Sequence, residues 1–251
     1  MNEDLQKRII QKKENGMSIA KIAAEEGIYS GTVSKFLKSQ GISTARNPII
    51  KNMFHSIDNE EKAYWLGFLY ADGSVSKYNQ IGVELQASDV GHLEKLKKFL
   101  NTNTKISIGE VQSKNKIYKR CRLFFCSKEM AQDLANLGCT NKKSLTLTFP
   151  TKEQVPDEFL YDFIRGYCDG DGSLINTEKT YCLNITSTKT FLDGMIERTG
   201  WKDCKRDPHG KAESWRIAAK ANVHQYLEQM YGAANIYLDR KYELYKAMIA
   251  V

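Results

Sequence analysis

Two stretches of the sequence repeat one pattern and decide the fold: EEKAYWLGFLYADGSV at residues 60–75 and DEFLYDFIRGYCDGDGSL at residues 157–174. Each is an apolar segment that ends in Asp-Gly-Ser. Gly67 lies five residues before Asp72 in the first stretch, and Gly166 lies five residues before Asp171 in the second. A pattern that recurs at a wide spacing indicates that one structural unit occurs twice in the chain.

The segments that follow the two stretches also match one another. Alternation of apolar and polar residues in QIGVELQAS and in TYCLNITST is typical of strands with one buried and one exposed face. In each copy a helix, a further strand and a last helix are predicted next, at 89–100, 118–127 and 129–138 and again at 189–200, 213–221 and 222–232. Each half is therefore predicted to run helix, strands, helix, strands, helix.

The repeated helix carries small residues four positions apart, which lie on one stripe of a helix. They are Gly67 and Ala71 in the first copy and Gly166 and Gly170 in the second. Such a stripe lets a second helix backbone approach closely. If the two helices pack there, Asp72 and Asp171 lie side by side at their C-terminal ends. Adjacent carboxylates repel each other unless a cation binds between them, and Mg²⁺ there would activate water against a phosphodiester.

The segments WLGFLYADG and IRGYCDGDG resemble the motif of the LAGLIDADG homing endonucleases, and the likeness covers about residues 55–251. The resemblance implies an α+β fold of two pseudo-symmetric αββαββα halves, whose two antiparallel sheets form a DNA-binding saddle. It also implies that the last aspartate of each motif binds the catalytic metal, Mg²⁺ or Mn²⁺, with help from the preceding backbone carbonyl. Those positions are Asp72 with Ala71, and Asp171 with Gly170.

One motif position departs from the family pattern. The first acidic position is Tyr70 in the first copy and Asp169 in the second. Because the resemblance assigns no metal binding to this position, the tyrosine does not predict loss of activity. The resemblance also implies a lysine that stabilises the charged transition state, and Lys143 and Lys241 are the candidates. Plain surface lysines are the alternative.

The exposed faces of the predicted strands carry candidate DNA-contacting side chains. Gln and Asn make paired hydrogen bonds to adenine, and Arg and Lys contact guanine or phosphate. Gln86 and Asn184 lie 14 and 13 residues after their aspartates, so we expect them at matching places. The other candidates are expected to share strand faces in pairs, Arg120 with Arg122 and Arg216 with Lys220. A solvated sheet face is the alternative.

The first 45 residues are predicted to form three helices. Ser18 and Ser30 are expected to cap the second and third, and Gly27 is expected in the turn between them. A helix, a short glycine turn and a second helix are the layout of a DNA-binding helix-turn-helix, and residues 17–42 resemble those of resolvases and transposases. A three-helix domain that does not bind DNA is the alternative. The expected DNA contacts are Tyr29, Ser30, Thr32, Ser34, Lys35 and Lys38.

The composition fits a globular protein with a polyanionic partner. The formal net charge is +7, and 41% of the 251 residues are hydrophobic. No apolar run approaches the roughly 20 residues that cross a bilayer. The polar N-terminus is not a secretory signal, so we expect a cytoplasmic protein without membrane contact. The six cysteines show no Cys-x-x-Cys spacing, which favours reduced thiols over a zinc site or disulfides.

Together these features predict a monomeric, site-specific endonuclease of a mobile genetic element that cuts both strands of a long double-stranded DNA target. The expected organisation is a helix-turn-helix domain at 1–45, a linker at 46–56 and an endonuclease domain at 57–251, with halves at about 57–150 and 151–251. A non-cleaving DNA-binding regulator is one alternative, which the two intact aspartates disfavour. An RNA-splicing maturase is another, which the helix-turn-helix disfavours.

Overall fold

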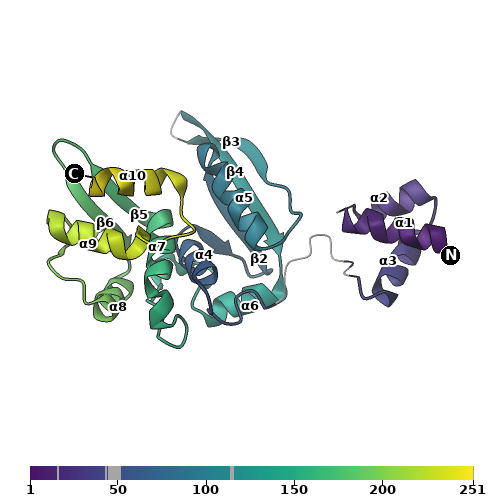
Figure 1. The fold of residues 1–251 in the computed structure, drawn as a ribbon, viewed down its shortest axis with the longest axis horizontal. Coiled ribbons are helices and arrows are strands. Elements are labelled where there is room, and N and C mark those ends of the chain that lie inside the picture. Colours follow the sequence, from purple (N-terminus) through teal and green to yellow (C-terminus); the bar gives the residue numbers. More distant parts are fainter. Residues whose placement is uncertain (16, 43, 45–51, 114–115, 251) are drawn as a thin grey trace. The chain divides into compact units, whose positions relative to one another are not determined.

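The computed structural model describes residues 1–15, 17–42, 44, 52–113 and 116–250 (Figure 1). The chain separates into two compact units. The smaller unit comprises residues 1–50 together with 100–104, and the larger comprises residues 51–99 and 105–251.

The smaller unit contains the three predicted helices, α1 (Glu3–Glu14), α2 (Ile19–Glu26) and α3 (Ser30–Ser39). Ser18 begins α2 as predicted, because its side chain accepts a hydrogen bond of 3.3 Å from the backbone N–H of Lys21. Gly27 ends α2 with a φ of 66°, which glycine adopts without strain. The prediction that Ser30 caps α3 is wrong, because Tyr29 is the cap and Ser30 is the first helical residue. The buried core consists of Ile9, Ile22, Ala23, Val33 and Leu37.

The predicted linker at 46–56 falls partly on residues 46–51, which lie outside the described residues. Residues 52–56 belong to the packed part of the larger unit instead. Met53 and Phe54 are buried there, and the Phe54 ring lies 5.8 Å from that of Phe99. These two apolar side chains are the physical reason why the packed domain begins before residue 57.

The larger unit consists of two halves with the same order of elements. The first half contains α4 (Glu60–Ala71), β1 (Gly73–Val75), β2 (Gln80–Gln86), η1 (Ala87–Asp89), α5 (Val90–Phe99), β3 (Ser107–Ser113), β4 (Lys116–Cys126), α6 (Lys128–Asn136) and η2 (Lys143–Leu145). The second contains η3 (Asp157–Phe159), α7 (Leu160–Asp171), β5 (Gly172–Asn176), β6 (Tyr181–Ser187), α8 (Lys189–Thr199), β7 (Lys205–His209), β8 (Ala212–Ile217), α9 (Lys220–Tyr231) and α10 (Asp239–Ile249). The predicted α+β fold of two αββαββα halves is confirmed, and α10 is an additional helix.

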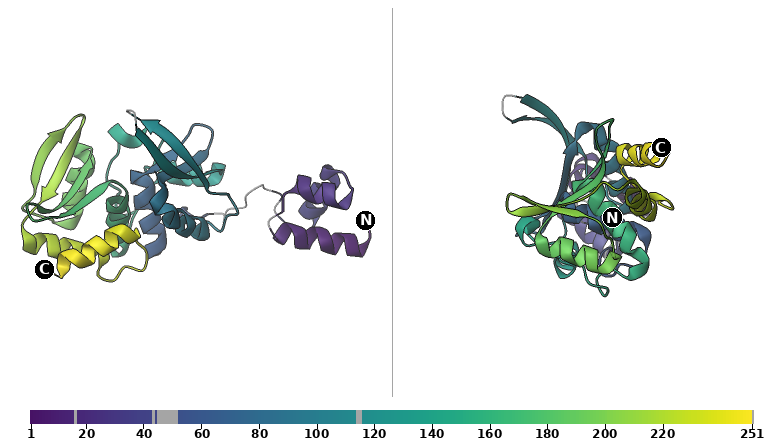
Figure 2. Two further views of the ribbon diagram at one scale, coloured as in Figure 1. Left: turned by 90° about the horizontal axis from the view of Figure 1, so that it is seen from above. Right: turned by 90° about the vertical axis from the view of Figure 1, so that its left-hand side faces the viewer.

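Each half contributes one four-stranded antiparallel sheet. The strand orders are β1-β2-β4-β3 and β5-β6-β8-β7, so the two sheets have the same topology. One face of each sheet is buried beneath helices, with Val83 and Leu123 in the first half and Ile185 and Trp215 in the second. In Figure 2 the two sheets lie on one side of the larger unit, and the yellow-green helix α9 and the yellow helix α10 lie on the other. The opposite sheet faces are left open for a ligand.

Helices α4 and α7 pack against each other between the two sheets. A Cβ placed on Gly67 would lie 2.0 Å from the carbonyl oxygen of Phe163, and one placed on Gly166 would lie 1.9 Å from that of Tyr64. The two contacts are reciprocal, as expected for equivalent helices related by a pseudo-twofold axis. The close approach predicted from the small residues is therefore present, and it aligns the C-terminal ends of the two helices.

Candidate active site and nucleic-acid interface

The two motif aspartates stand at the C-terminal ends of the paired helices. Asp72 caps α4, and Asp171 is the last residue of α7. Gly170 brings the helices together at this level: a Cβ on it would lie 2.3 Å from the Cβ of Ala71 and 3.4 Å from Oδ2 of Asp72. The carboxylate of Asp72 therefore lies against the backbone of the helix that carries Asp171.

The protonation of both aspartates reflects this crowding. Removal from water, followed by the charge of Asp171, raises the pKa of Asp72 to about 6, and Lys241 and Lys143 oppose that rise only in part. Loss of hydration between the helix ends also raises the pKa of Asp171, although part of its side chain is accessible to solvent. A cation bound to both carboxylates would favour their ionised forms.

The two predicted lysines bind the ends of the motif helices. Lys143 Nζ donates to the carbonyl oxygens of Gly73 and, at 3.4 Å, of Ala71. Lys241 Nζ donates to the carbonyl oxygen of Gly172 at 2.7 Å. Because Gly73 and Gly172 are equivalent, both lysines place a positive charge on the same end of each helix, where the helix dipole favours it. They are 8% and 4% exposed, so they are not plain surface lysines.

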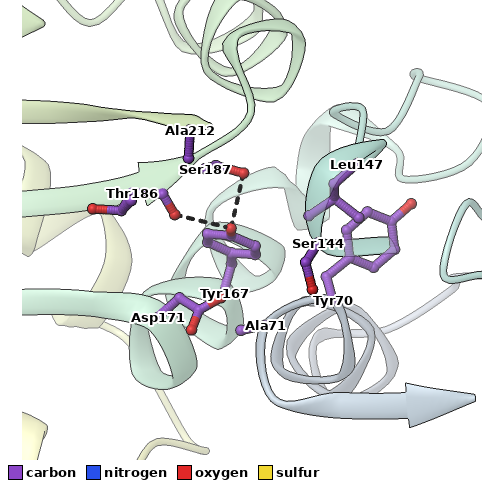
Figure 3. Close-up of a pocket in the computed structure, with 9 residues that line it drawn as sticks. All are labelled: Tyr70, Ala71, Ser144, Leu147, Tyr167, Asp171, Thr186, Ser187 and Ala212. Atoms are coloured by element: carbon purple, nitrogen blue, oxygen red, sulfur yellow. Dashed lines mark hydrogen bonds between the residues drawn. The ribbon is translucent and has the colours of Figure 1, made fainter. Parts of the chain in front are cut away.

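A cavity of about 210 Å³ opens beside Asp171, with walls from both halves (Figure 3). Ala71 and Ser144 line it from the first half, and Asp171 and Tyr167 line it from the second. The Tyr167 hydroxyl donates to Oγ of Ser187 at 2.9 Å, and burial raises its pKa above the ordinary value. Tyr167 thus supplies a fixed, neutral wall beside the carboxylate.

Asp169 is a buried internal carboxylate, and its role differs from that of Asp171. It accepts hydrogen bonds of 2.7 Å from the hydroxyls of Tyr64 and Tyr231 and from the backbone N–H of Leu238. These bonds tie α7 to α4, to α9 and to the residue before α10. Tyr70, at the equivalent position of the first copy, donates to a backbone carbonyl oxygen after α6. Both residues at this motif position therefore make internal hydrogen bonds, Asp169 as an acceptor and Tyr70 as a donor. The tyrosine leaves the pair of Asp72 and Asp171 intact.

The helix ends offer oxygen ligands of the type that a hard cation binds, but only two carboxylates. Among the described residues, no three His, Cys, Asp or Glu side chains cluster in a way that could hold a metal ion. A cation at Asp72 and Asp171 would need additional ligands from the backbone, water or phosphate, which is usual for Mg²⁺. The carbonyl of Ala71, one predicted ligand, also accepts the 3.4 Å hydrogen bond of Lys143. Carboxylate and carbonyl oxygens nonetheless fit the ion type that the sequence predicts.

The predicted DNA-contacting residues of the first sheet share its exposed face. Gln86 lies opposite Arg120, and Glu84 lies opposite Arg122. Two of them already have partners in the protein: Arg122 forms an ion pair with Glu84, and Gln86 donates to Oδ2 of Asp89 at 3.1 Å. A ligand that contacts Arg122 or Gln86 would either replace the bond to Glu84 or Asp89 or add a further hydrogen bond beside it.

In the second sheet, Asn184 lies opposite Arg216 on the exposed face. The predicted equivalence of Asn184 and Gln86 is wrong, because the serine of the second Asp-Gly-Ser pairs with Asn184, whereas that of the first pairs with Gly82. The physical reason is strand length: β5 has five residues and β1 has three, so the chain returns later in the second half. Counting residues from the aspartates therefore matched the wrong positions.

Lys220 does not share a strand with Arg216, which corrects a second prediction. Strand β8 ends at Ile217, and Lys220 is the first residue of α9. The alternation of apolar and polar residues stops at Ile217, and the alanines that follow favour a helix.

Phe124 is a surface residue that the sequence analysis missed. It is 40% exposed and lies on the same face of β4 as Arg120 and Arg122. The alternation that places the two arginines on one face also places Phe124 there, so the signal was present in the sequence.

In the smaller unit, the predicted contact residues lie on or beside α3. Tyr29 is 79% exposed at its start. Thr32, Lys35 and Lys38 are exposed along the helix, and Ser30 and Ser34 are partly exposed. This unit therefore offers hydroxyl and ammonium groups on one helix.

Solved structures with a similar fold include homing endonucleases. I-WcaI bound to its DNA recognition sequence aligns with 75% of this chain and 87% of its own, at a TM-score of 0.52 and 13% identity. The meganuclease I-SmaMI bound to uncleaveable DNA, a LAGLIDADG homing endonuclease, aligns with 74% of this chain and 89% of its own, at a TM-score of 0.50 and 15% identity. The chain has the LAGLIDADG homing endonuclease fold.

A further solved structure with a similarity to this chain has a different name. Full-length DUF199/WhiA from Thermatoga maritima aligns with 79% of this chain and 63% of its own, at a TM-score of 0.48 and 15% identity. No protein-family model matches the LAGLIDADG-fold chain. In the part of the chain that the structure describes, no helix is long and apolar enough to span a membrane.

Two curated relatives come from Methanocaldococcus jannaschii. The chain is 28% identical over 134 residues to DNA-directed RNA polymerase subunit Rpo1C and 29% identical over 147 residues to replication factor C small subunit. The alignments cover 53% and 57% of this chain but only 15% and 8% of the relatives. The chain therefore matches a small part of each.

Proposed function

We propose that this protein is a site-specific endonuclease that hydrolyses one phosphodiester bond in each strand of a long duplex DNA target. The observation that carries the proposal is the pair Asp72 and Asp171, held at adjoining helix ends with raised pKa values. Crowded carboxylates of this kind are costly to fold unless a cation binds them. A divalent cation is what phosphodiester hydrolysis requires at such a site.

Asp72 and Asp171 would hold Mg²⁺ or Mn²⁺, with the carbonyl oxygens of Ala71 and Gly170 as further ligands. When bound, the metal supplies charge stabilisation to the phosphate and acidifies water. The two capping lysines have a separate effect. Their positive charges oppose the rise in the pKa of both aspartates and so favour the ionised carboxylates that a metal needs. They also place positive charge near the phosphate in the transition state.

Duplex DNA is the partner that the open sheet faces suit best. Arg120, Arg122 and Arg216 lie on these faces, and the chain carries a formal net charge of +7. The homing endonucleases I-WcaI and I-SmaMI, whose fold this chain shares, are bound to DNA in their structures. Because both halves lie on one chain, a monomer would suffice and the target need not be palindromic.

The smaller unit would add a second DNA contact. Its three helices have the order of a helix-turn-helix, and α3 exposes Thr32 and Lys35. We expect this unit to increase affinity and to have little effect on the chemical step, since the aspartate pair belongs to the larger unit.

The two curated relatives support the proposal that this chain belongs to a mobile genetic element. About half of this chain matches 15% of one protein and 8% of another with a different name, as expected for a unit that occurs within larger proteins. Homing-type cleavage of DNA would account for such a distribution.

The test is cleavage of a randomised duplex library by the full chain, in Mg²⁺ and in EDTA, with the ends of the products sequenced. Defined double-strand breaks that require Mg²⁺ are expected, and the aligned ends would give the target. Selective retention of one DNA sequence without breaks would contradict the endonuclease and favour a non-cleaving DNA-binding regulator. If the chain retains structured RNA and does not retain duplex DNA when both are offered, the result would favour a maturase.

A further inference from the structure

We propose that Phe124 and Arg216 contact the same position of the two target half-sites and require different bases there. Phe124, in the first half of the protein, would select a T·A pair through the thymine methyl group. Arg216, in the second half, would select a G·C pair. The inference rests on the proposed function, because it names the bases that the DNA-binding surface prefers.

Strand register makes the two residues equivalent. In each half, the serine of Asp-Gly-Ser lies two residues after the motif aspartate and pairs across the sheet. In the first sheet it pairs with Gly82, which pairs in turn with Phe124. In the second sheet it pairs with Asn184, which pairs in turn with Arg216. The pseudo-twofold relation of the halves therefore places Phe124 and Arg216 at equal distances from the centre of a bound duplex.

This position lies near the candidate active site. The serine lies about 7 Å along its strand from the motif aspartate, and Phe124 and Arg216 lie two strands across the sheet from the serine, about 10 Å away. The side chains are on the exposed sheet face, opposite the face that the helices cover. DNA held with its phosphates at Asp72 and Asp171 would therefore lie along the sheet faces that carry both positions.

The first-half position is apolar. A Cβ on Gly82 would lie 2.1 Å from Cδ1 of Phe124, so the phenyl ring lies over the glycine backbone. The absence of a side chain at residue 82 thus fixes where the ring lies, and the ring remains 40% exposed. Neither residue offers a side-chain hydrogen bond. In the major groove, an apolar side chain finds its best contact in the methyl group of thymine.

The second-half position is polar and charged. The Arg216 side chain is 45% exposed, and its Nη2 lies 4.0 Å from Oδ2 of Asp207, with which it forms an ion pair. Asn184 beside it accepts a hydrogen bond of 2.5 Å from Ser214. A distant ion partner leaves the guanidinium able to turn toward a base edge. Arginine makes its most common specific contact with O6 and N7 of guanine.

The experiment exchanges the pair from one half into the other. The wild-type chain and the variant Gly82→Asn/Phe124→Arg are each used to select bound duplexes from a randomised library in Ca²⁺, which separates binding from cutting. The wild type is expected to select T·A in one half-site and G·C at the equidistant position of the other. At the position that wild type fills with T·A, the exchange is expected to raise the ratio of G·C to T·A among bound duplexes by at least about fivefold. The base preferences at other positions are expected to stay unchanged.

Two further variants control the result. Phe124→Ala keeps the backbone and Gly82 as they are, and it is expected to lose the preference at the same single position. Cys126→Ser, on the same exposed face two residues further along β4, is expected to leave that position unchanged. Circular dichroism of each variant checks its folding.

An unchanged T·A preference in the exchange variant and in Phe124→Ala would overturn this inference while leaving the proposed function standing. Selection of the same base by both half-sites in the wild type would also overturn it. A wild type that selects no sequence would contradict the proposed function itself, and the inference with it.

Discussion

Gly67 and Gly166 occupy equivalent places in the interface of α4 and α7, and each faces the backbone of the other helix. A Cβ on Gly67 would lie 2.0 Å from Phe163 O, and a Cβ on Gly166 would lie 1.9 Å from Tyr64 O. Real Cβ atoms do not approach a carbonyl oxygen so closely, so the two helices fit at this distance only with glycine in both places. The position of the aspartates depends on that fit.

Gly67→Ala and Gly166→Ala are each expected to destabilise the larger unit by at least about 1–3 kcal/mol, because overpacking forces the helix backbones apart. Urea unfolding measures the change. Gly91→Ala is the matched control, since a Cβ there meets nothing within 4 Å and alanine favours the helix α5 that contains it. Equal stability of Gly67→Ala and wild type would show that the helices are not held at this spacing.

Asp72→Asn is expected to change how stability depends on pH. The carboxyl of Asp72 has a pKa of about 6 in the folded chain and an ordinary value of about 3.9 when unfolded. Its protonated form therefore stabilises the fold below about pH 4, and this contribution is lost as the pH rises through 6. Relative to wild type, the variant should gain about 2–3 kcal/mol of unfolding free energy between pH 4 and pH 7.5.

The check is urea unfolding of both proteins at the two pH values, without divalent metal. Parallel curves for wild type and Asp72→Asn would mean that the carboxyl is not perturbed.

Mg²⁺ is expected to stabilise the wild type against heat and to have no such effect on Asp72→Asn/Asp171→Asn. The reason is mass action: an ion that binds only the folded chain raises its stability, by about 2.7 kcal/mol at a hundred times its Kd. Differential scanning fluorimetry over a series of Mg²⁺ concentrations measures this. Equal shifts of the melting temperature for the two proteins would show that Mg²⁺ binds at a site other than the two aspartates.

Lys143→Met and Lys241→Met are each expected to cost about 1–3 kcal/mol, because the substitution leaves carbonyl oxygens at a helix end without their donor. Cleavage should fall in both variants, even at temperatures where they remain folded. Lys179→Met, at an exposed lysine, is the control for loss of one charge. Full activity in both folded variants would restrict these lysines to a structural role.

Lys35→Ala and Lys38→Ala test the smaller unit. If α3 contacts phosphates, each substitution should weaken DNA binding and reduce the slope of log affinity against log salt by about 1. Lys7→Ala removes the same charge from an exposed position on α1. If Lys7→Ala weakens DNA binding as much as the two α3 substitutions do, the loss reflects the net charge of the unit and not a contact by α3.

The features that could be predicted from the sequence were those that local periodicity encodes. The alternating residues around Val83 and Ile185 gave the strands, and the glycine stripe predicted the pairing of α4 with α7. Register could not be predicted, because the pairing of Asn184 depends on where the chain turns and not on its distance from Asp171. Lys220 was misplaced for a similar reason, since the strand pattern gives no warning of a helix that begins after two alanines.

The site itself was only partly accessible to sequence reasoning. The motif suggested Asp72 and Asp171 as the acidic pair, but not that Lys143 and Lys241 are buried and bound to the helix ends, which is a long-range relation. The network of Asp169 with Tyr64 and Tyr231 was not predictable either, since it joins residues from three separate elements.

Whether Asp72 and Asp171 hold the catalytic metal is tested most directly by the rate of double-strand cleavage of the selected target by wild type, Asp72→Asn, Asp171→Asn and the double variant. Binding of the target by each protein is measured in Ca²⁺ alongside. If both carboxylates hold metal, every variant should bind the target, and the double variant should lose at least about a thousandfold in rate. Cleavage by the double variant at the wild-type rate would show that the two aspartates do not hold the catalytic metal.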